Sequence, residues 1–301
     1  MENSETNDLR SEVRDHVNFI ALGLIVYSLI SLVSVLPDDL FFGGRLYWHL
    51  ATLGTVAGVA FMCFLYRHTL PPSALFVKSG RRMSPSALIL ILIVFFSAQM
   101  VNTLFGLLLE HILNAFGLSM ATSMSAATAT SATPAMLLYA AVIAPVAEEV
   151  VYRGFCLRLA DRFGHVFSIL FSSLAFAVMH ENIPQALFAF HVGLILGYVT
   201  LRYSIHWAIA LHFINNFLLG DLADYLTAFL SPAAKTLLYY LFFGMMLLAS
   251  LPALLSQKNG LAHFVRTHRA RPRTFRLAFS SVLVITLLLM HLIPAVLLLD
   301  F

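Results

Sequence analysis

The chain has 301 residues, of which 60% are hydrophobic and 11% are charged, and its formal net charge is +3. Soluble domains carry about 25% charged residues, so this composition excludes an ordinary soluble protein. The small positive charge does not indicate nucleic-acid binding, because the basic residues lie between apolar segments. No polar region is long enough to form a second domain, and we expect one membrane domain over residues 1–301.

In chain order, residues 1–16 are polar and mostly acidic, which predicts an N-terminal tail. The first apolar run lacks the small-residue cleavage site of a signal peptide. About 20 apolar residues cross a bilayer as a helix, and this rule predicts an all-α polytopic membrane protein with about eight to nine transmembrane helices. Segment 119–134 is rich in Ser, Ala and Thr, which predicts a flexible loop. The predicted spans are roughly 17–36, 46–66, 86–109, 135–157, 165–182, 186–201, 205–220, 235–255 and 277–299.

The distribution of Lys and Arg predicts the orientation in the membrane. With a cytoplasmic N-terminus, all of these residues except Arg45 and Lys235 fall on the cytoplasmic side. We therefore expect an integral, multi-pass protein, in the plasma membrane if the source is prokaryotic, whose basic run 263–276 rests against anionic lipid headgroups. The residues predicted to be cytoplasmic are Arg10, Arg14, Arg67, Lys78, Arg81, Arg82, Arg153, Arg158, Arg162, Arg202, Lys258, Arg266, Arg269, Arg271, Arg273 and Arg276.

Segment 145–155 places two adjacent acids, Glu148 and Glu149, and then Arg153 in the fourth predicted span. A charge at the bilayer centre costs at least about 2.5–3.5 kcal/mol, so these residues indicate a functional site. Glu149 and Arg153 are spaced i,i+4 in the favourable order and are interpreted as a structural ion pair. Glu148 is turned about 100° away and lacks a local partner. It is therefore the candidate general base.

Phe176 and His180 share one helix face, and a single histidine there is commonly a structural core residue. If the chain turns near Gly164, however, Glu148 and His180 lie equally far from the turn along two antiparallel helices. At about 1.5 Å per residue they reach the same depth. The pair could then hold one water molecule between them.

His212 and Asn216 also share one helix face, and two donors on one face can bind an oxyanion. The alternative is an interhelical hydrogen bond, worth roughly 0.6 kcal/mol. Asn215 points elsewhere and is interpreted as structural, and His291 is assigned no role. Gly193 and Gly197 form a GxxxG pattern, which predicts close packing of the fifth, sixth and seventh spans.

Together these motifs resemble a known family. Glu148-Glu149-Val-Val-Tyr-Arg153 matches EExxxR, Phe176 to His180 matches FxxxH, and His212 to Asn216 matches HxxxN. In this order they resemble the CAAX protease and bacteriocin-processing family of intramembrane proteases, and within it the type II CAAX prenyl endopeptidases. The resemblance covers roughly residues 137–220, which we take as the catalytic core.

The resemblance implies a helical fold whose intramembrane cavity opens toward the cytosol. It implies a membrane-associated peptide or protein substrate, prenylated or of leader type, within the lipid bilayer. The implied roles are activation of water by Glu148 and His180, stabilisation of the oxyanion by His212 and Asn216, and support of the site by Glu149 and Arg153.

A metal cofactor is a separate question. One glutamate and two histidines could ligate zinc. The histidines nevertheless lie on different spans, unlike the paired ligands of one helix in HExxH, and we expect a metal-free, glutamate-based hydrolase with zinc as the alternative. Cys63 and Cys156 lack metal-ligand spacing.

Two other functions compete with the protease. One is a non-proteolytic immunity or scaffold protein of the same fold, which is disfavoured because all three motifs are complete. The other is a transporter or proton relay, which predicts inverted repeats that the sequence lacks.

Overall fold

A computed structural model describes residues 2–77, 81–127 and 131–300. Met1, Lys78 of the predicted cytoplasmic set and residues 128–130 of the predicted loop lie outside the described residues. Within the described ranges the chain is built from helices without strands, and a single β-bridge joins Ser119 to Asp300. The all-α fold predicted from composition is confirmed.

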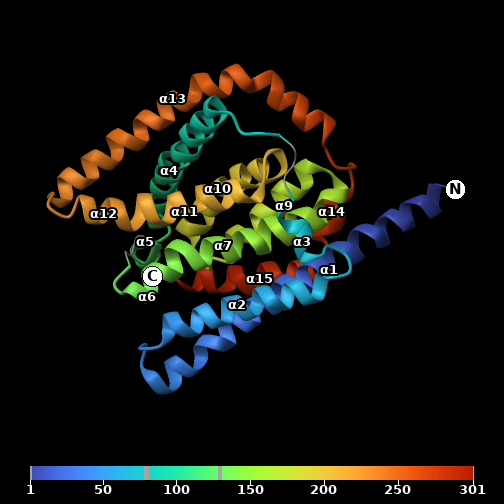
Figure 1. Ribbon diagram of the computed structural model, residues 1–301, viewed down its shortest axis with the longest axis horizontal. Helices are drawn as coiled ribbons and strands as arrows, with labels where there is room; N and C mark the ends of the chain where they lie inside the picture. Colours follow the sequence, from blue (N-terminus) through green and yellow to red (C-terminus); the bar gives the residue numbers. More distant parts are fainter. Residues whose placement is uncertain (1, 78–80, 128–130, 301) are drawn as a thin grey trace.

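Figure 1 shows the helices as a bundle in which α1 and α2 form an outer hairpin and α13 arches over the opposite side. The N-terminal half comprises α1 (Glu2–Pro37), η1 (Asp38–Phe42), α2 (Tyr47–Tyr66), α3 (Pro72–Leu75), α4 (Pro85–Asn114) and α5 (Ala121–Ala127). A central run follows, made of α6 (Pro134–Leu138), η2 (Tyr139–Ile143), α7 (Ala144–Glu148), η3 (Glu149–Cys156), α8 (Leu157–Ala160) and η4 (Asp161–Phe163). The remainder comprises α9 (His165–Val178), α10 (Ile183–Arg202), α11 (Ile205–Phe213), η5 (Ile214–Leu222), α12 (Ala223–Leu226), α13 (Pro232–Thr267), α14 (Thr274–Phe279) and α15 (Val282–Leu297).

The described part of the chain contains six helical runs long and apolar enough to cross a membrane. Helices α9 and α15 are apolar but shorter, and α11 does not qualify, because it is α-helical for only nine residues before η5 begins. A membrane-embedded helical protein is therefore confirmed, whereas the number of about eight to nine spans is not. The six runs are Arg10–Phe42, Tyr47–Tyr66, Pro85–Asn114, Pro134–Phe163, Ile183–Arg202 and Pro232–Thr267.

Two segments predicted to be irregular are helical. Helix α1 begins at Glu2, so the predicted tail continues into the first span without a break. The expectation of a flexible loop over 119–134 is wrong for α5. Asn182 Nδ2 donates to the Ser123 carbonyl at 2.8 Å, and the Thr122 amide donates to Asp300 Oδ2 at 2.9 Å. These contacts stabilise α5, whose own residues are mostly small or polar.

The central run from Pro134 to Phe163 contains two stretches of π-helix, η2 and η3. Wide π turns inside α-helices are frequent at functional sites, because the extra residue in the turn shifts the faces that follow it. Pro145, which lacks a backbone donor, lies between the two stretches. Glu148 ends α7 and Glu149 begins η3, so the two acids lie where the helix changes its pitch.

The GxxxG pattern on α10 does mark close packing. An added Cβ at Gly193 would lie 3.0 Å from Ser173 Cβ on α9, and one at Gly197 would lie 3.2 Å from Leu157 Cδ1 on α8. The neighbours nearest to both glycines thus belong to the fourth and fifth predicted spans. Helix α10 also packs against α11, so the fifth, sixth and seventh predicted spans do lie together.

The predicted cytoplasmic segments meet at one end of the bundle. Arg162 donates to Glu12 Oε1 at 2.8 Å, and Arg14 donates to Ser280 Oγ at 3.0 Å. The Val166 amide donates to the His268 carbonyl at 3.2 Å, which joins the end of α13 to the start of α9. Figure 1 shows the N-terminus at this end, while α5, α6 and the C-terminus lie at the other.

Candidate active site

Glu149 is the centre of a buried polar cluster. Its side chain is 0% exposed, and Oε1 accepts from Arg153 Nη1 at 3.0 Å and from His212 Nδ1 at 2.9 Å. The ion pair predicted from the i,i+4 spacing is present, and the contact with His212 joins η3 to α11. Such a buried pair contributes to stability only when its geometry is good and its remaining atoms are satisfied.

Phe176 on α9 organises the groups around this pair. The Arg153 guanidinium lies 4.2 Å from the centre of the Phe176 ring. The ring of His180 packs edge-on against Phe176 at 4.9 Å between centroids, and that of His212 packs edge-on at 5.7 Å. The two candidate histidines, on different helices, therefore share one aromatic neighbour. The FxxxH motif supplies both the histidine and the surface on which it rests.

His212 lies between the two acids of the EExxxR motif. Its Nε2 is 3.6 Å from Glu148 Oε2, which is longer than a good hydrogen bond. Because a carboxylate only accepts, the Nδ1 of His212 carries the proton in its bond to Glu149. The atom that faces Glu148 is therefore Nε2. The Glu148 side chain is 16% exposed, so it is the more accessible of the two acids.

His180 is held by the backbone of its own helix. Its Nδ1 lies 2.9 Å from the Phe176 carbonyl, which can only accept, so Nδ1 is the donor and Nε2 is left unbonded. The histidine in ion-pair distance of Glu148 is His212, and the described residues show no hydrogen bond between Glu148 and His180. The expectation that Glu148 and His180 lie opposite each other treated both helices as uniform α-helices. It took no account of the π-helix η3 or of α11, which brings His212 next to Glu148.

Asn216 is fixed by a chain of amides that the sequence did not reveal. Its Nδ2 donates to the Ala140 carbonyl at 2.9 Å, and its Oδ1 accepts from Asn215 Nδ2 at 3.0 Å. Asn215 Oδ1 in turn accepts from Gln99 Nε2 on α4 at 3.3 Å. Asn215 therefore supports Asn216, which agrees with its interpretation as a structural residue, although the bond to Asn216 itself was not predicted. Two adjacent asparagines in an apolar span were the signal that could have indicated this chain.

Several buried polar atoms near the cluster lack a hydrogen-bond partner. They are Glu149 Oε2, Arg153 Nε and Nη2, and Ser173 Oγ. More than about 90% of buried polar groups in proteins are paired with protein or with water. Among the described residues, these atoms are donors and acceptors that the protein contacts leave available.

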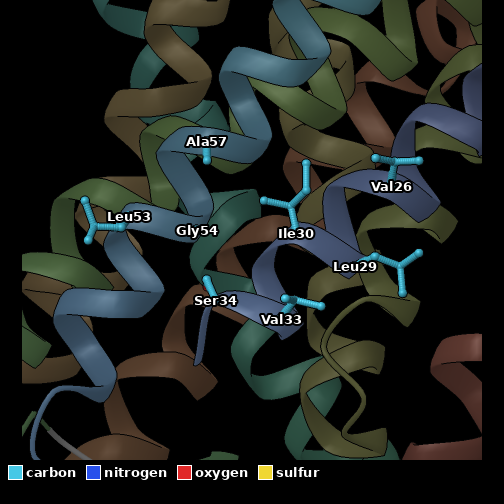
Figure 2. A pocket seen from close by; sticks show the side chains of 8 residues that line it. All are labelled: Val26, Leu29, Ile30, Val33, Ser34, Leu53, Gly54 and Ala57. Atoms are coloured by element: carbon cyan, nitrogen blue, oxygen red, sulfur yellow. The ribbon is translucent and has the colours of Figure 1, made fainter. Parts of the chain in front are cut away.

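An apolar hollow of about 450 Å³ lies beside the cluster, between α7 and α11. Its lining includes Pro145, Val146, Ile209 and Phe213, which come from the helices that carry Glu148 and His212. A second hollow, of about 470 Å³, lies between α1 and α2 and is shown in Figure 2. None of its lining residues is titratable or belongs to the cluster; they are Val26, Leu29, Ile30, Val33, Ser34, Leu53, Gly54 and Ala57.

The residues of the cluster do not fit a resident metal ion. Within the described ranges, no three His, Cys, Asp or Glu side chains converge in an arrangement that could hold one. The mechanism proposed for these residues uses no metal ion.

The fold and the cluster together define a class, namely helical membrane proteins with acids, histidines and an arginine gathered inside the bundle. Residues 129–218 match a family model described as type II CAAX prenyl endopeptidase Rce1-like, which confirms the resemblance for this segment. The matched segment contains all six candidate residues, and its family suggests protease activity. No curated protein and no solved structure matches the chain.

Proposed function

We propose that the protein is an intramembrane endopeptidase that hydrolyses peptide bonds of membrane-associated substrates, prenylated or of leader type. The observation that carries the proposal is the position of His212 between Glu148 and Glu149, against the same phenylalanine as His180. This arrangement lies within the segment that matches the CAAX endopeptidase family. A non-proteolytic relative would not require all four groups to converge.

In the proposed mechanism Glu148 acts as the general base, with His180 Nε2 as the second acceptor for the same water. As the water oxygen attacks the substrate carbonyl carbon, one of its protons passes to Glu148. A positioned general base contributes about 10²–10⁴-fold to such a step. The proton later moves to the nitrogen of the leaving amine as the carbon–nitrogen bond breaks, and the carboxylate is regenerated.

The negative charge on the substrate oxygen is met by His212 and Asn216. Asn216 uses one amide hydrogen for the Ala140 carbonyl, and the other remains for the oxyanion. His212 Nε2 becomes a donor when it shares the proton taken up by Glu148, 3.6 Å away. Glu149 and Arg153 hold the Nδ1 side of His212 and keep this orientation.

The substrate approaches within the bilayer. The apolar hollow between α7 and α11 borders the helices that carry Glu148 and His212, and it suits the apolar part of a membrane-associated substrate. We propose that the basic end of the bundle faces the cytosol, which gives a multi-pass protein with a cytoplasmic N-terminus.

The test is peptide hydrolysis by the purified protein in lipid nanodiscs, with prenylated and unprenylated peptides, products identified by mass spectrometry. We expect Glu148→Gln and His212→Ala to reduce hydrolysis by about 10²-fold or more. Glu110→Gln and His111→Ala are the matched controls, since neither residue belongs to the cluster or lines the hollow between α7 and α11, and they retain activity. Hydrolysis should persist in a chelator. Wild-type rates in both folded cluster variants would reject the proposal and favour the non-proteolytic alternative.

A further inference from the structure

The turn that follows His180 is fastened to two helices outside the matched segment. Glu181 Oε1 lies 2.8 Å from His291 Nδ1 on α15, and His291 Nε2 lies 3.1 Å from Ser28 Oγ on α1. Because a carboxylate only accepts, His291 Nδ1 is the donor, and the Ser28 hydroxyl donates to the Nε2 of the neutral ring. The His291 side chain is only 4% exposed. We call this chain of contacts the Glu181 anchor.

The backbone of Glu181 shows why an anchor is needed. Among the described residues, Glu181 is the one non-glycine residue with a positive φ, at +50°. Glycine normally fills this left-handed position after a helix, because other side chains clash there. A residue with a long side chain remains in this conformation only where its surroundings hold it. The bond from His291 to the Glu181 carboxylate supplies that restraint, so glutamate here serves a purpose that glycine could not.

The anchored residue is one peptide bond from His180, the proposed second acceptor for the attacking water. The His180 amide donates to the Ala177 carbonyl at 3.2 Å and the Glu181 amide to the Val178 carbonyl at 3.1 Å, which forms a tight last turn of α9. If Glu181 left the left-handed region, the peptide plane between it and His180 would rotate. The His180 ring would then lose its bond to the Phe176 carbonyl and its packing against the Phe176 ring.

We propose that Glu181 and His291 are positioning residues that hold the His180 ring against Phe176, with its Nε2 unbonded. The expected effect on peptide hydrolysis rests on the proposed function, whereas the position of the His180 ring does not depend on it. It also gives a role to α1 and α15, which lie outside the segment that matches the family.

A set of variants separates the carboxylate from the backbone conformation. Glu181→Gln keeps an acceptor for His291, whereas Glu181→Met keeps only the length of the side chain. Glu181→Gly relieves the positive φ but removes the anchor. His291→Ala removes the donor, and Ser28→Ala weakens the same chain where His291→Ala does not fold. Glu110→Met is the matched control.

Glu110 is suited as a control because it fastens another segment of the chain. It accepts from Ser119 Oγ at 2.7 Å and from the Met120 amide at 2.8 Å, and it does not contact the turn after His180. Its replacement therefore removes a comparable clamp without releasing Glu181.

The first readout is the ¹⁵N NMR spectrum of the histidine side chains in nanodiscs, with His180 assigned through His180→Gln. We expect a single Nδ1–H tautomer of His180 in the wild type, Glu181→Gln and Glu110→Met. We expect a tautomer mixture in Glu181→Met, Glu181→Gly and His291→Ala. Unchanged His180 signals in Glu181→Met and His291→Ala would overturn the inference.

The second readout is peptide hydrolysis. We expect kcat to fall by about 10- to 100-fold in the three anchor variants, with KM nearly unchanged, since His180 is misplaced but the binding surface is intact. Combining Glu181→Met with His291→Ala should lower kcat no further than either change alone, because both break one contact. Glu181→Gln should retain wild-type kcat.

The outcomes separate the two proposals. Full activity in folded Glu181→Met and His291→Ala, or in Glu181→Gly, would reject the positioning role and leave the protease intact. If the wild type hydrolyses no peptide, the proposed function fails, and the NMR spectra alone decide whether the anchor orients His180.

Discussion

Arg153 is a fully buried cation whose ion-pair partner is Glu149. Replacing Arg153 with methionine, which fills much of the same space, would leave the buried Glu149 without its cationic partner, with the hydrogen bond from His212 remaining. We predict a loss of about 3–5 kcal/mol of unfolding free energy, measured by denaturant titration in micelles. The control is Arg162→Met, which breaks the exposed pair with Glu12 and should cost at most about 1 kcal/mol. Equal losses in the two variants would contradict this account of the buried pair.

Gly193 provides the space in which Arg153 and α9 fit together. A methyl group there would lie 3.0 Å from Ser173 Cβ and 3.2 Å from Arg153 Nη2. We predict that Gly193→Ala destabilises the protein by about 1–3 kcal/mol, because the added carbon overpacks the contact. Gly106→Ala on α4 is the control, since nothing lies within 4 Å of its added Cβ. It should leave thermal stability unchanged or raise it, whereas a neutral Gly193→Ala would show that α10 shifts freely.

The sequence identified the individual candidate residues of the site better than it identified the residues that they contact on other helices. The spacing of Glu149 and Arg153 fixed their ion pair, because both lie on one helix. The contact of Glu148 with His212 depends on how separate helices are rotated, which spacing along the chain does not determine. The same reason explains why the support of Asn216 by Gln99, and of Glu181 by His291, was missed.

Helix α5 is joined to the C-terminal end by Asp300. The hydrogen bonds that the Thr122 side chain and amide donate lower the pKa of Asp300 below its ordinary value of 3.8. The contact therefore stabilises the folded form above pH 3.8 and is lost as the pH falls through the lower, folded-state pKa. We predict that Asp300→Asn lowers the hydrogen-exchange protection of residues 119–127 at pH 6. The two proteins should become alike at the lowest pH, and a difference that persists there would contradict this linkage.

The elements themselves were largely predicted, because runs of apolar residues fix where helices lie. The bounds of α2, α4 and α10 differ from the predicted spans by only a few residues. The π turns of the central run were not predicted, since hydropathy carries no signal for pitch. Helix α5 was missed because its stability comes from Asn182 and Asp300, which are distant in the sequence.

One end of the bundle is rich in basic residues and the other end is covered by α5. Labelling each end from a known side of the membrane therefore tests the proposed orientation. We predict that, in a Cys63→Ser, Cys156→Ala background, a cysteine at Arg273 reacts with an impermeant maleimide in inside-out vesicles. A cysteine at Phe116, which is 77% exposed, should react in right-side-out vesicles. The reverse pattern would place the N-terminus outside. Asn182, two residues after His180, contacts α5, so the same labelling also shows on which side of the membrane this turn lies.

The contacts of the last helix set the order in which the molecule can be completed during synthesis. The partners of Ser119, Thr122 and Glu181 lie at Asp300 and His291, which are synthesised later than the segments that they fasten. The matched segment can insert into the membrane before them, but its turn at Glu181 and its α5 cover stay unfastened until α15 and Asp300 have been made. A chain that stalls before α15 would therefore carry every motif and lack the finished architecture around them.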